Sequence, residues 1–244
     1  HGRKMRYRSI ENVLAEIDIL YHKYNVRSFV PEDDLFTVKK ERIINLCNSV
    51  SSRYKDLTFQ FPNGLSVATL DDDVIAAMIR MGMNVACIAI ESGSDFVQRK
   101  IIKKNASLTR AKKVVQSCRD QGVIVRCYYV LGFPGETISE MEETFKYAEE
   151  LGADWSTFSV ASPIPGTEMY KEFIELGYIA DGPSSWTGTS IRDRTFDTKE
   201  MSKENIKELA YRANLKVNFI NNINIKNLDF KNIETIFTNF VKTY

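Results

Sequence analysis

Polar residues and turn formers gather at the ends of five apolar segments in this chain of 244 residues. These end groups are Glu32-Asp33-Asp34, Pro62-Asn63-Gly64, Glu91-Ser92-Gly93, Gly132-Phe133-Pro134-Gly135-Glu136 and Ser162-Pro163-Ile164-Pro165-Gly166. Carboxylates and hydroxyl groups hold the polar parts of small ligands, and glycines let a ligand approach the backbone closely. Together the five groups predict a ligand-binding rim.

Each group also has an ordinary structural explanation, and from the residues alone both interpretations stay open. Asp33 and Asp34 suit the first turn of a following helix, and so does Glu136. Glu91 ends an apolar segment, where a carboxylate is costly unless it has a partner. Arg126 interrupts the fourth apolar segment, where it either binds a carboxylate ligand or forms an outward ion pair.

The five apolar segments are rich in β-branched and aromatic residues, and they predict β-strands. They cover Val26–Val30, Leu57–Phe61, Val85–Ile90, Val123–Leu131 and Trp155–Ala161, with starts 28 to 38 residues apart. Amphipathic helices alternate with them, beginning with an apolar stripe from Ile10 to Tyr24 that Ser9 is placed to cap. Repeated strand and helix units favour parallel strands, in a barrel or an open doubly wound sheet.

Helix boundaries are marked as well. Thr69-x-x-Asp72 and Thr137-x-x-Glu140 predict capping boxes. After Gly177 the pattern changes: the stretch from Asp181 to Asn205 predicts a long loop. Further helices are predicted over Lys203–Asn221 and Asp229–Thr243. We therefore expect a core over residues 1–180, and a loop with a helical C-terminal extension over residues 181–244.

Composition narrows the classes of partner. A formal net charge of +1 gives no reason to expect nucleic acid or a membrane surface as a partner. The sequence contains neither a run long enough to span a bilayer nor a secretion signal, so a soluble, cytoplasmic protein is expected. Four scattered cysteines, Cys47, Cys87, Cys118 and Cys127, are predicted to be small buried residues.

The end groups, in their order and spacing, resemble the radical S-adenosylmethionine (radical SAM) superfamily, especially the group with an upstream cobalamin-binding domain. The matching motifs are Glu-Asp-Asp-Leu-Phe-Thr from Glu32, Ile-Glu-Ser-Gly-Ser from Ile90, Gly-Phe-Pro-Gly-Glu-Thr from Gly132 and Pro-Ile-Pro-Gly-Thr from Pro163. The resemblance covers residues 1–180 of the sequence. It implies a partial (β/α)6 TIM-like barrel with its first strand missing, followed by C-terminal helices.

The resemblance also implies a set of residues that bind S-adenosylmethionine (SAM). Glu32, Asp33 and Asp34 match the motif near the methionine amino group, and Glu91 and Ser92 match the ribose and methionine position. Arg126 and Tyr128 are expected to point from the following strand. Gly132, Phe133, Pro134 and Glu136 match the glycine motif on the adenine side, and Ser162 follows the last strand.

Members of this superfamily hold a 4Fe-4S cluster on a C-x-x-x-C-x-x-C loop and cleave SAM reductively to a 5′-deoxyadenosyl radical, for hydrogen abstraction or methyl transfer. This sequence lacks that motif, so the cluster cysteines are expected upstream of His1, and the chain is expected to be a catalytically silent fragment. The resemblance implies a small-molecule or unknown substrate and an electron donor such as flavodoxin or ferredoxin. Cobalamin is a candidate second cofactor of the parent protein.

Two further functions stay open at this point. The missing cluster ligands also suit a barrel that serves as a non-catalytic scaffold or binding module. An ordinary barrel lyase or hydrolase could instead use Glu91 and Glu136 as its acid and base.

Overall fold

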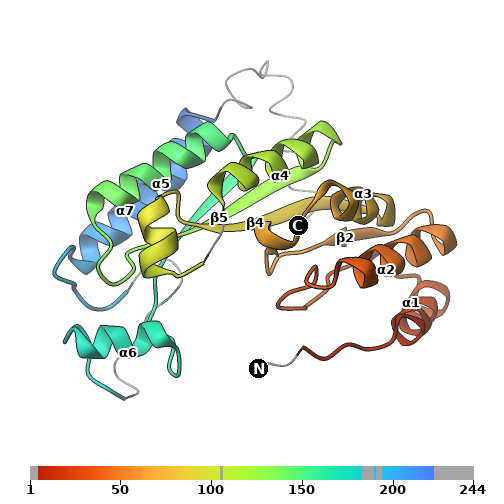
Figure 1. Cartoon of the computed structure of the whole chain (residues 1–244), viewed down its shortest axis with the longest axis horizontal. Helices are drawn as coiled ribbons and strands as arrows, with labels where there is room; N and C mark the ends of the chain where they lie inside the picture. Colours follow the sequence, from red (N-terminus) through yellow and green to blue (C-terminus); the bar gives the residue numbers. More distant parts are fainter. Residues whose placement is uncertain (1–4, 105–106, 183–189, 191–193, 223–244) are drawn as a thin grey trace. The chain divides into compact units, whose positions relative to one another are not determined.

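The computed structural model describes residues 5–104, 107–182, 190 and 194–222 (Figure 1). The chain forms two compact units, residues 1–88 with 116–125, and residues 89–115 with 126–244. Strands β4 (Met83–Glu91) and β5 (Ile124–Leu131) and helix α4 (Leu108–Asp120) each continue from one unit into the other. Within the described ranges, no helix has both the length and the apolar character of a membrane span.

The first unit alternates helices with short parallel strands. It holds α1 (Ile10–Tyr24), β1 (Ser28–Phe29), α2 (Lys40–Arg53), β2 (Thr58–Gln60), β3 (Leu65–Ser66), the 3-10 turn η1 (Val67–Thr69) and α3 (Asp72–Met81). Its strand order is β1-β2-β4-β5, with β3 paired to β4. Phe59 of β2 aligns with Phe29 on one side and Met83 on the other, and its ring stacks on that of Phe29. Helices α2 and α3 pack together in this unit.

The second unit continues the same pattern. It holds the π-helical turn η2 (Val97–Ile101), α5 (Ile138–Leu151), β6 (Trp155–Val160), α6 (Glu168–Glu175), α7 (Lys203–Leu215) and the π-helical turn η4 (Lys216–Ile220). Strands β5 and β6 are parallel over six residue pairs, from Arg126 with Trp155 to Leu131 with Val160. Helices α5 and α7 lie side by side in Figure 1, and η4 contacts both α5 and β6.

Most of the predicted elements are confirmed. The five predicted strands become β1, β2, β4, β5 and β6, and the fold class is a parallel α/β sheet with helices. Ser9 caps α1, because its hydroxyl oxygen accepts from the backbone N–H of Asn12 at 3.1 Å. Thr137 and Glu140 form the predicted capping box of α5. All four cysteines are buried, as predicted.

Other predictions need correction. Asp71 caps α3 by accepting from the Val74 N–H at 3.0 Å, so the capping box predicted from Thr69 to Asp72 is wrong. Thr69 instead ends η1, and its hydroxyl oxygen lies 2.6 Å from that of the buried Thr37. The helix predicted to end at Asn221 is α7 followed by η4. The helix predicted over Asp229–Thr243 lies outside the described residues.

Candidate functional site

In the first unit, the ends of β1 and β2 meet. The Asn63 Nδ2 donates to the Glu32 Oε2 at 3.1 Å, and the side chains of Asp33 and Asp34 are exposed. Helix α2 begins only at Lys40, so Asp33 and Asp34 are not first-turn acids of that helix. That ordinary explanation of the two aspartates is therefore wrong.

In the second unit, β5 and β6 each have one buried face and one half-buried face, and Arg126, Tyr128, Thr157 and Ser159 lie on the half-buried one. Along β5 the fully buried residues alternate with half-buried ones, and the half-buried positions are Arg126, Tyr128 and Val130. Along β6 the half-buried positions are Trp155, Thr157 and Ser159. Because these positions pair in register, Tyr128 lies beside Thr157 and Val130 beside Ser159. A barrel interior is normally filled by branched apolar side chains, so a polar, half-buried face is suited to a ligand.

Glu91 is the last residue of β4, and its backbone is strained. Its φ of 72° lies in the left-handed region, which residues other than glycine rarely adopt. Its side chain keeps 20% exposure and accepts from the Lys104 Nζ at 2.7 Å, so the carboxylate has the partner that its position demands. Strain of this kind persists only where the surrounding structure holds the backbone in place, and it is common at functional sites.

Ser92 and Gly93 pack against α5, where both contact the hydroxyl oxygen of Thr144. The Ser92 hydroxyl is fully buried, lies 3.0 Å from the Thr144 hydroxyl oxygen and accepts from the Ser94 N–H. The Gly93 N–H donates to the same Thr144 oxygen at 2.9 Å. The amide of the buried Gln98 donates to the carbonyl oxygens of Ile90 and Ser92 at 2.6 and 2.7 Å. These contacts hold the end of β4 in place, and the predicted contact of Ser92 with SAM stays a prediction.

Glu136 closes the loop that follows β5. Its side chain has no exposure, and its Oε2 accepts from the backbone N–H groups of Gly132 and Phe133 at 2.6 and 3.1 Å. Burial raises the pKa of Glu136 to about 8, although the two N–H donors act in the opposite direction. Thr137 caps α5, so Glu136 lies before the helix and not in its first turn. A carboxyl group buried in this way is not placed to exchange protons with a substrate, which disfavours the acid and base pair of Glu91 and Glu136.

The residues predicted from the sequence did not include Arg194, Thr157 or Ser159. The guanidinium of Arg194 is 3% exposed and donates to the Gly132 carbonyl oxygen at 3.0 Å, although its segment was predicted to be a plain loop. No periodic or motif signal marks that residue. Thr157 and Ser159 could have been found, because an alternation of two along β6 puts them on one face.

Ser162 lies just beyond β6, where its hydroxyl donates to the Ser190 carbonyl oxygen at 2.9 Å. The N–H of Ala161 donates to the Leu131 carbonyl oxygen at 2.8 Å, so the ends of β5 and β6 stay aligned. The second unit thus aligns the end groups of β5 and β6, and Arg126 and Tyr128 lie earlier along β5, beside Trp155 and Thr157. The convergence of the Glu32 to Asp34 segment with these residues stays a prediction.

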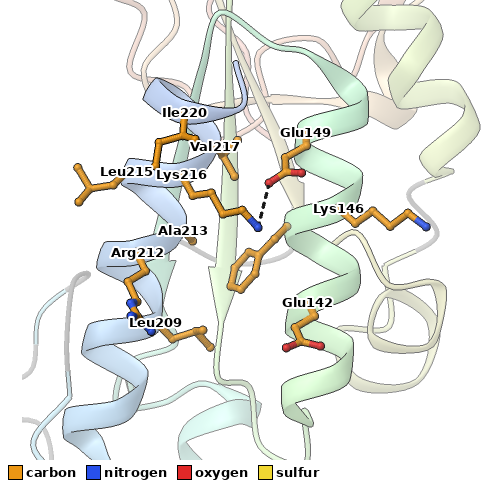
Figure 2. A pocket seen from close by; sticks show the side chains of 11 residues that line it. Glu142, Lys146, Glu149, Leu209, Arg212, Ala213, Leu215, Lys216, Val217 and Ile220 are labelled. Carbon is orange, nitrogen blue, oxygen red and sulfur yellow. Dashed lines mark ion pairs between the residues drawn. The ribbon is translucent and has the colours of Figure 1, made fainter. Parts of the chain in front are cut away.

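A groove with a volume of about 580 Å³ lies between α5 and the α7–η4 helix (Figure 2). Figure 2 shows Lys216 reaching towards Glu149, and their Nζ and Oε1 atoms are 3.8 Å apart. None of the predicted site residues lines this groove. We place the candidate site at the strand ends, because the groove is a seam between two helices edged by charged side chains.

A 4Fe-4S cluster does not fit the residues at hand. Among the residues that the structure describes, no three His, Cys, Asp or Glu side chains gather as metal ligands would. Cys47 and Cys118 are buried thiols whose pKa burial raises, to about 12 and about 11, which disfavours the thiolate form that binds iron. The described residues therefore offer no set of ligands for a cluster.

A comparison with known families decides the assignment. The Radical SAM superfamily profile matches residues 1–148, which is more than half of the chain. This chain belongs to the radical SAM superfamily. The resemblance predicted from the end groups is confirmed, and the matched region includes Glu32, Glu91, Arg126 and Glu136.

Curated radical SAM relatives include methyltransferases. The chain is 30% identical over 184 residues to cytidylyl-2-hydroxyethylphosphonate methyltransferase of Streptomyces wedmorensis, covering 73% of this chain and 34% of the relative. It is 27% identical to an uncharacterized methyltransferase of Pyrococcus horikoshii, covering 87% of this chain and 45% of the relative. The chain thus spans a third to just under half of the length of these relatives.

Solved structures support the fold. The radical SAM methyltransferase TsrM from Kitasatospora setae, solved with cobalamin and a 4Fe-4S cluster, has a TM-score of 0.63 at 17% identity, covering 72% of this chain and 33% of that one. Coproporphyrinogen III oxidase from Escherichia coli, a radical SAM enzyme, has a TM-score of 0.55 at 14% identity, covering 87% and 48%. At these identities the likeness establishes the fold alone.

Proposed function

We propose that this chain binds SAM against the polar face of β4 to β6 in its second unit. One observation carries the proposal: Glu91, Arg126, Tyr128, Thr157 and Ser159 occupy the half-buried positions of three strands in a radical SAM chain. SAM carries a carboxylate, an ammonium group, a sulfonium, ribose hydroxyls and an adenine. The donors and acceptors of this face match those groups in kind.

Each residue would have a distinct part in binding. The Arg126 guanidinium would pair with the SAM carboxylate, and the Glu91 carboxylate would accept from ribose hydroxyls or the ammonium group. The Gly132 to Glu136 loop would offer its backbone to the adenine, since the Glu136 side chain is completely buried and its Oε2 is occupied within the loop. Tyr128 would fill the space between, beside Thr157. Ser162 completes the proposed set in the second unit, and a contact of the Glu32 to Asp34 segment with SAM stays a prediction.

For the whole protein we propose a radical SAM enzyme that, with its cluster loop supplied, cleaves SAM for hydrogen abstraction or methyl transfer. A small-molecule substrate, a flavodoxin or ferredoxin as electron donor, and cobalamin as second cofactor are parts of this proposal. The methyltransferases among the relatives favour methyl transfer.

Calorimetric titration of SAM under anaerobic conditions tests the binding proposal. We expect saturable binding by the wild-type protein, and at least about tenfold weaker binding by Glu91→Gln or Arg126→Met, because each change removes a charge-assisted contact. Glu143→Gln, an exposed residue of α5, is the matched control and should bind normally. No binding by the wild-type protein would reject the proposal. Binding without any 5′-deoxyadenosine after cluster reconstitution and reduction would favour the non-catalytic binding module.

A further inference from the structure

Arg194 is a nearly completely buried cation with one donor on the end of β5 and another on the turn before α7. Its Nη1 donates to the Gly132 carbonyl oxygen at 3.0 Å. Its Nη2 donates to the Thr198 hydroxyl oxygen at 3.1 Å and to the Met201 carbonyl oxygen at 3.3 Å. Arg194 is 3% exposed, and burying its charge is costly, so the bonds made by Nη1 and Nη2 offset part of that cost, while Nε makes no hydrogen bond. Arg194 therefore ties the end of β5 to the turn that precedes α7.

The peptide groups around Gly132 are held from both sides by two buried side chains, those of Glu136 and Arg194. The Gly132 N–H donates to the Glu136 carboxylate at 2.6 Å, and its carbonyl oxygen accepts from Arg194. Its φ of +79° is in the left-handed region, and a Cβ there would lie 3.2 Å from both the Arg194 Nη1 and the Ile206 Cδ1. The loop that follows β5 therefore starts from a residue whose N–H and carbonyl oxygen are both hydrogen-bonded and which has little room for a side chain.

We infer that Arg194 is a positioning residue for SAM binding, which it supports by fixing the Gly132 to Glu136 loop. This inference rests on the proposed function, because it concerns the same site. In this proposed role, Arg194 contacts the loop and does not contact the ligand. It presents the loop backbone in the geometry that an adenosyl group needs, and ligand affinity falls steeply when such a frame is loosened.

Only an arginine suits this position. Its planar fork donates to the Gly132 carbonyl oxygen through one nitrogen and to the Met201 and Thr198 oxygens through another. A lysine carries one nitrogen and cannot span both sides in the same way. The conservative variant is therefore expected to fall between the wild type and a neutral variant.

The test compares SAM dissociation constants, by calorimetry, for wild type, Arg194→Met, Arg194→Lys and a control, Arg212→Met. Arg212 is an exposed arginine of α7 with 76% side-chain exposure, so it matches the charge change without the buried contacts. Amide hydrogen exchange at Gly132 and Phe133 and the thermal midpoint are read alongside. We expect at least about tenfold weaker SAM binding for Arg194→Met, about threefold for Arg194→Lys and no change for Arg212→Met, with faster exchange in the loop.

The outcomes separate this inference from the proposed function. If the wild type binds SAM and Arg194→Met has a lower thermal midpoint but the same SAM affinity, Arg194 is merely structural and the inference is overturned. If the wild type binds no SAM, the proposed function is rejected, and the inference that rests on it is rejected as well. Should Arg194→Met not fold, Arg194→Lys decides: a threefold loss of affinity supports the inference, and an unchanged affinity overturns it.

Discussion

At the scale of single residues, Glu136 is subject to two opposing effects on its ionisation. Complete burial disfavours the carboxylate, whereas the N–H groups of Phe133 and Gly132 and the nearby Arg194 favour it. Burial is the larger effect and raises the pKa of Glu136 from 4.5 to about 8. The folded chain therefore keeps a proton on this group in a pH range where the unfolded chain has lost it.

This difference predicts a specific pH dependence of stability. Between pH 4.5 and about 8 the folded state binds more protons, so the contribution of Glu136 is fully present below pH 4.5 and is lost as the pH rises through 8. Glu136→Gln cannot ionise but keeps an oxygen that accepts from the two N–H groups. Urea unfolding should find the variant as stable as wild type near pH 5, and more stable by on the order of a few kcal/mol at pH 9. Parallel pH profiles for the two proteins would contradict this, and Glu143→Gln should follow the wild type.

At Gly93, close packing against α5 leaves no room for a side chain. A Cβ at this position would lie 2.5 Å from the Tyr147 Cβ and 2.8 Å from the Thr144 Cα, and the latter is backbone that cannot easily shift. Gly93→Ala should therefore destabilise the protein by about 2–4 kcal/mol through overpacking. Gly135→Ala is the comparison, because its Cβ would meet nothing within 4 Å and carries only the cost of a positive φ. Equal losses for both variants in denaturant unfolding would show that close packing at Gly93 is unimportant.

At the scale of elements, helix α7 and turn η4 cover the outer edge of β6 with asparagines. The Asn214 amide pairs with the N–H and the carbonyl oxygen of Phe158 at 3.1 and 3.0 Å. The Asn218 amide does the same with Ser156, at 2.7 Å for both bonds. The two asparagines are four positions apart, so they lie on one helix face and replace the hydrogen bonds of a further strand. Along Ser156–Phe158, the outer side of β6 is therefore not left as an unpaired edge.

Removing one of these amides should be costly. Asn218→Ala leaves the N–H and the carbonyl oxygen of Ser156 buried without their partner, because both Asn218 and Ser156 are 1% exposed. We expect a loss of about 2–4 kcal/mol in the free energy of unfolding, from two unsatisfied backbone groups. Asn205→Ala, an exposed position on the same helix, should change stability little. If urea unfolding gave both variants the same stability, the pairing along β6 would contribute nothing.

How well the sequence predicts an element depends on how far apart in the chain the interacting residues lie. Strand and helix periods are local, so β4, β5 and α1 could be placed from alternation and capping residues. Asn218 and Arg194 act through partners 62 residues away in the chain, so no local pattern identifies their roles. Glu136 was found as part of a motif, but its burial depends on how α5 and the loop before it fold together. The strands and their ends could therefore be predicted, and the side chains that hold those ends could not.

At the scale of the whole molecule, the two compact units share secondary structure. Residues Met83–Ile88 of β4 belong to the first unit and its last residues to the second, and β5 likewise divides after Val125. A break in a continuous strand would leave backbone groups on both sides without part of their ladder. The candidate site lies at the ends of these strands, so its side chains stay in place only while β4 and β5 keep their hydrogen bonds.

We therefore predict that the units unfold in one cooperative transition. Hydrogen exchange in increasing denaturant should give the same opening free energy for α2 amides, such as Leu46 in the first unit, as for α5 amides, such as Ala148 in the second. Gly93→Ala, a change in the second unit, should lower the protection of both helices by the same amount, since a shared transition transmits the loss. If Gly93→Ala lowered protection in α5 and left α2 unchanged, the units would be separate folding domains despite their common strands.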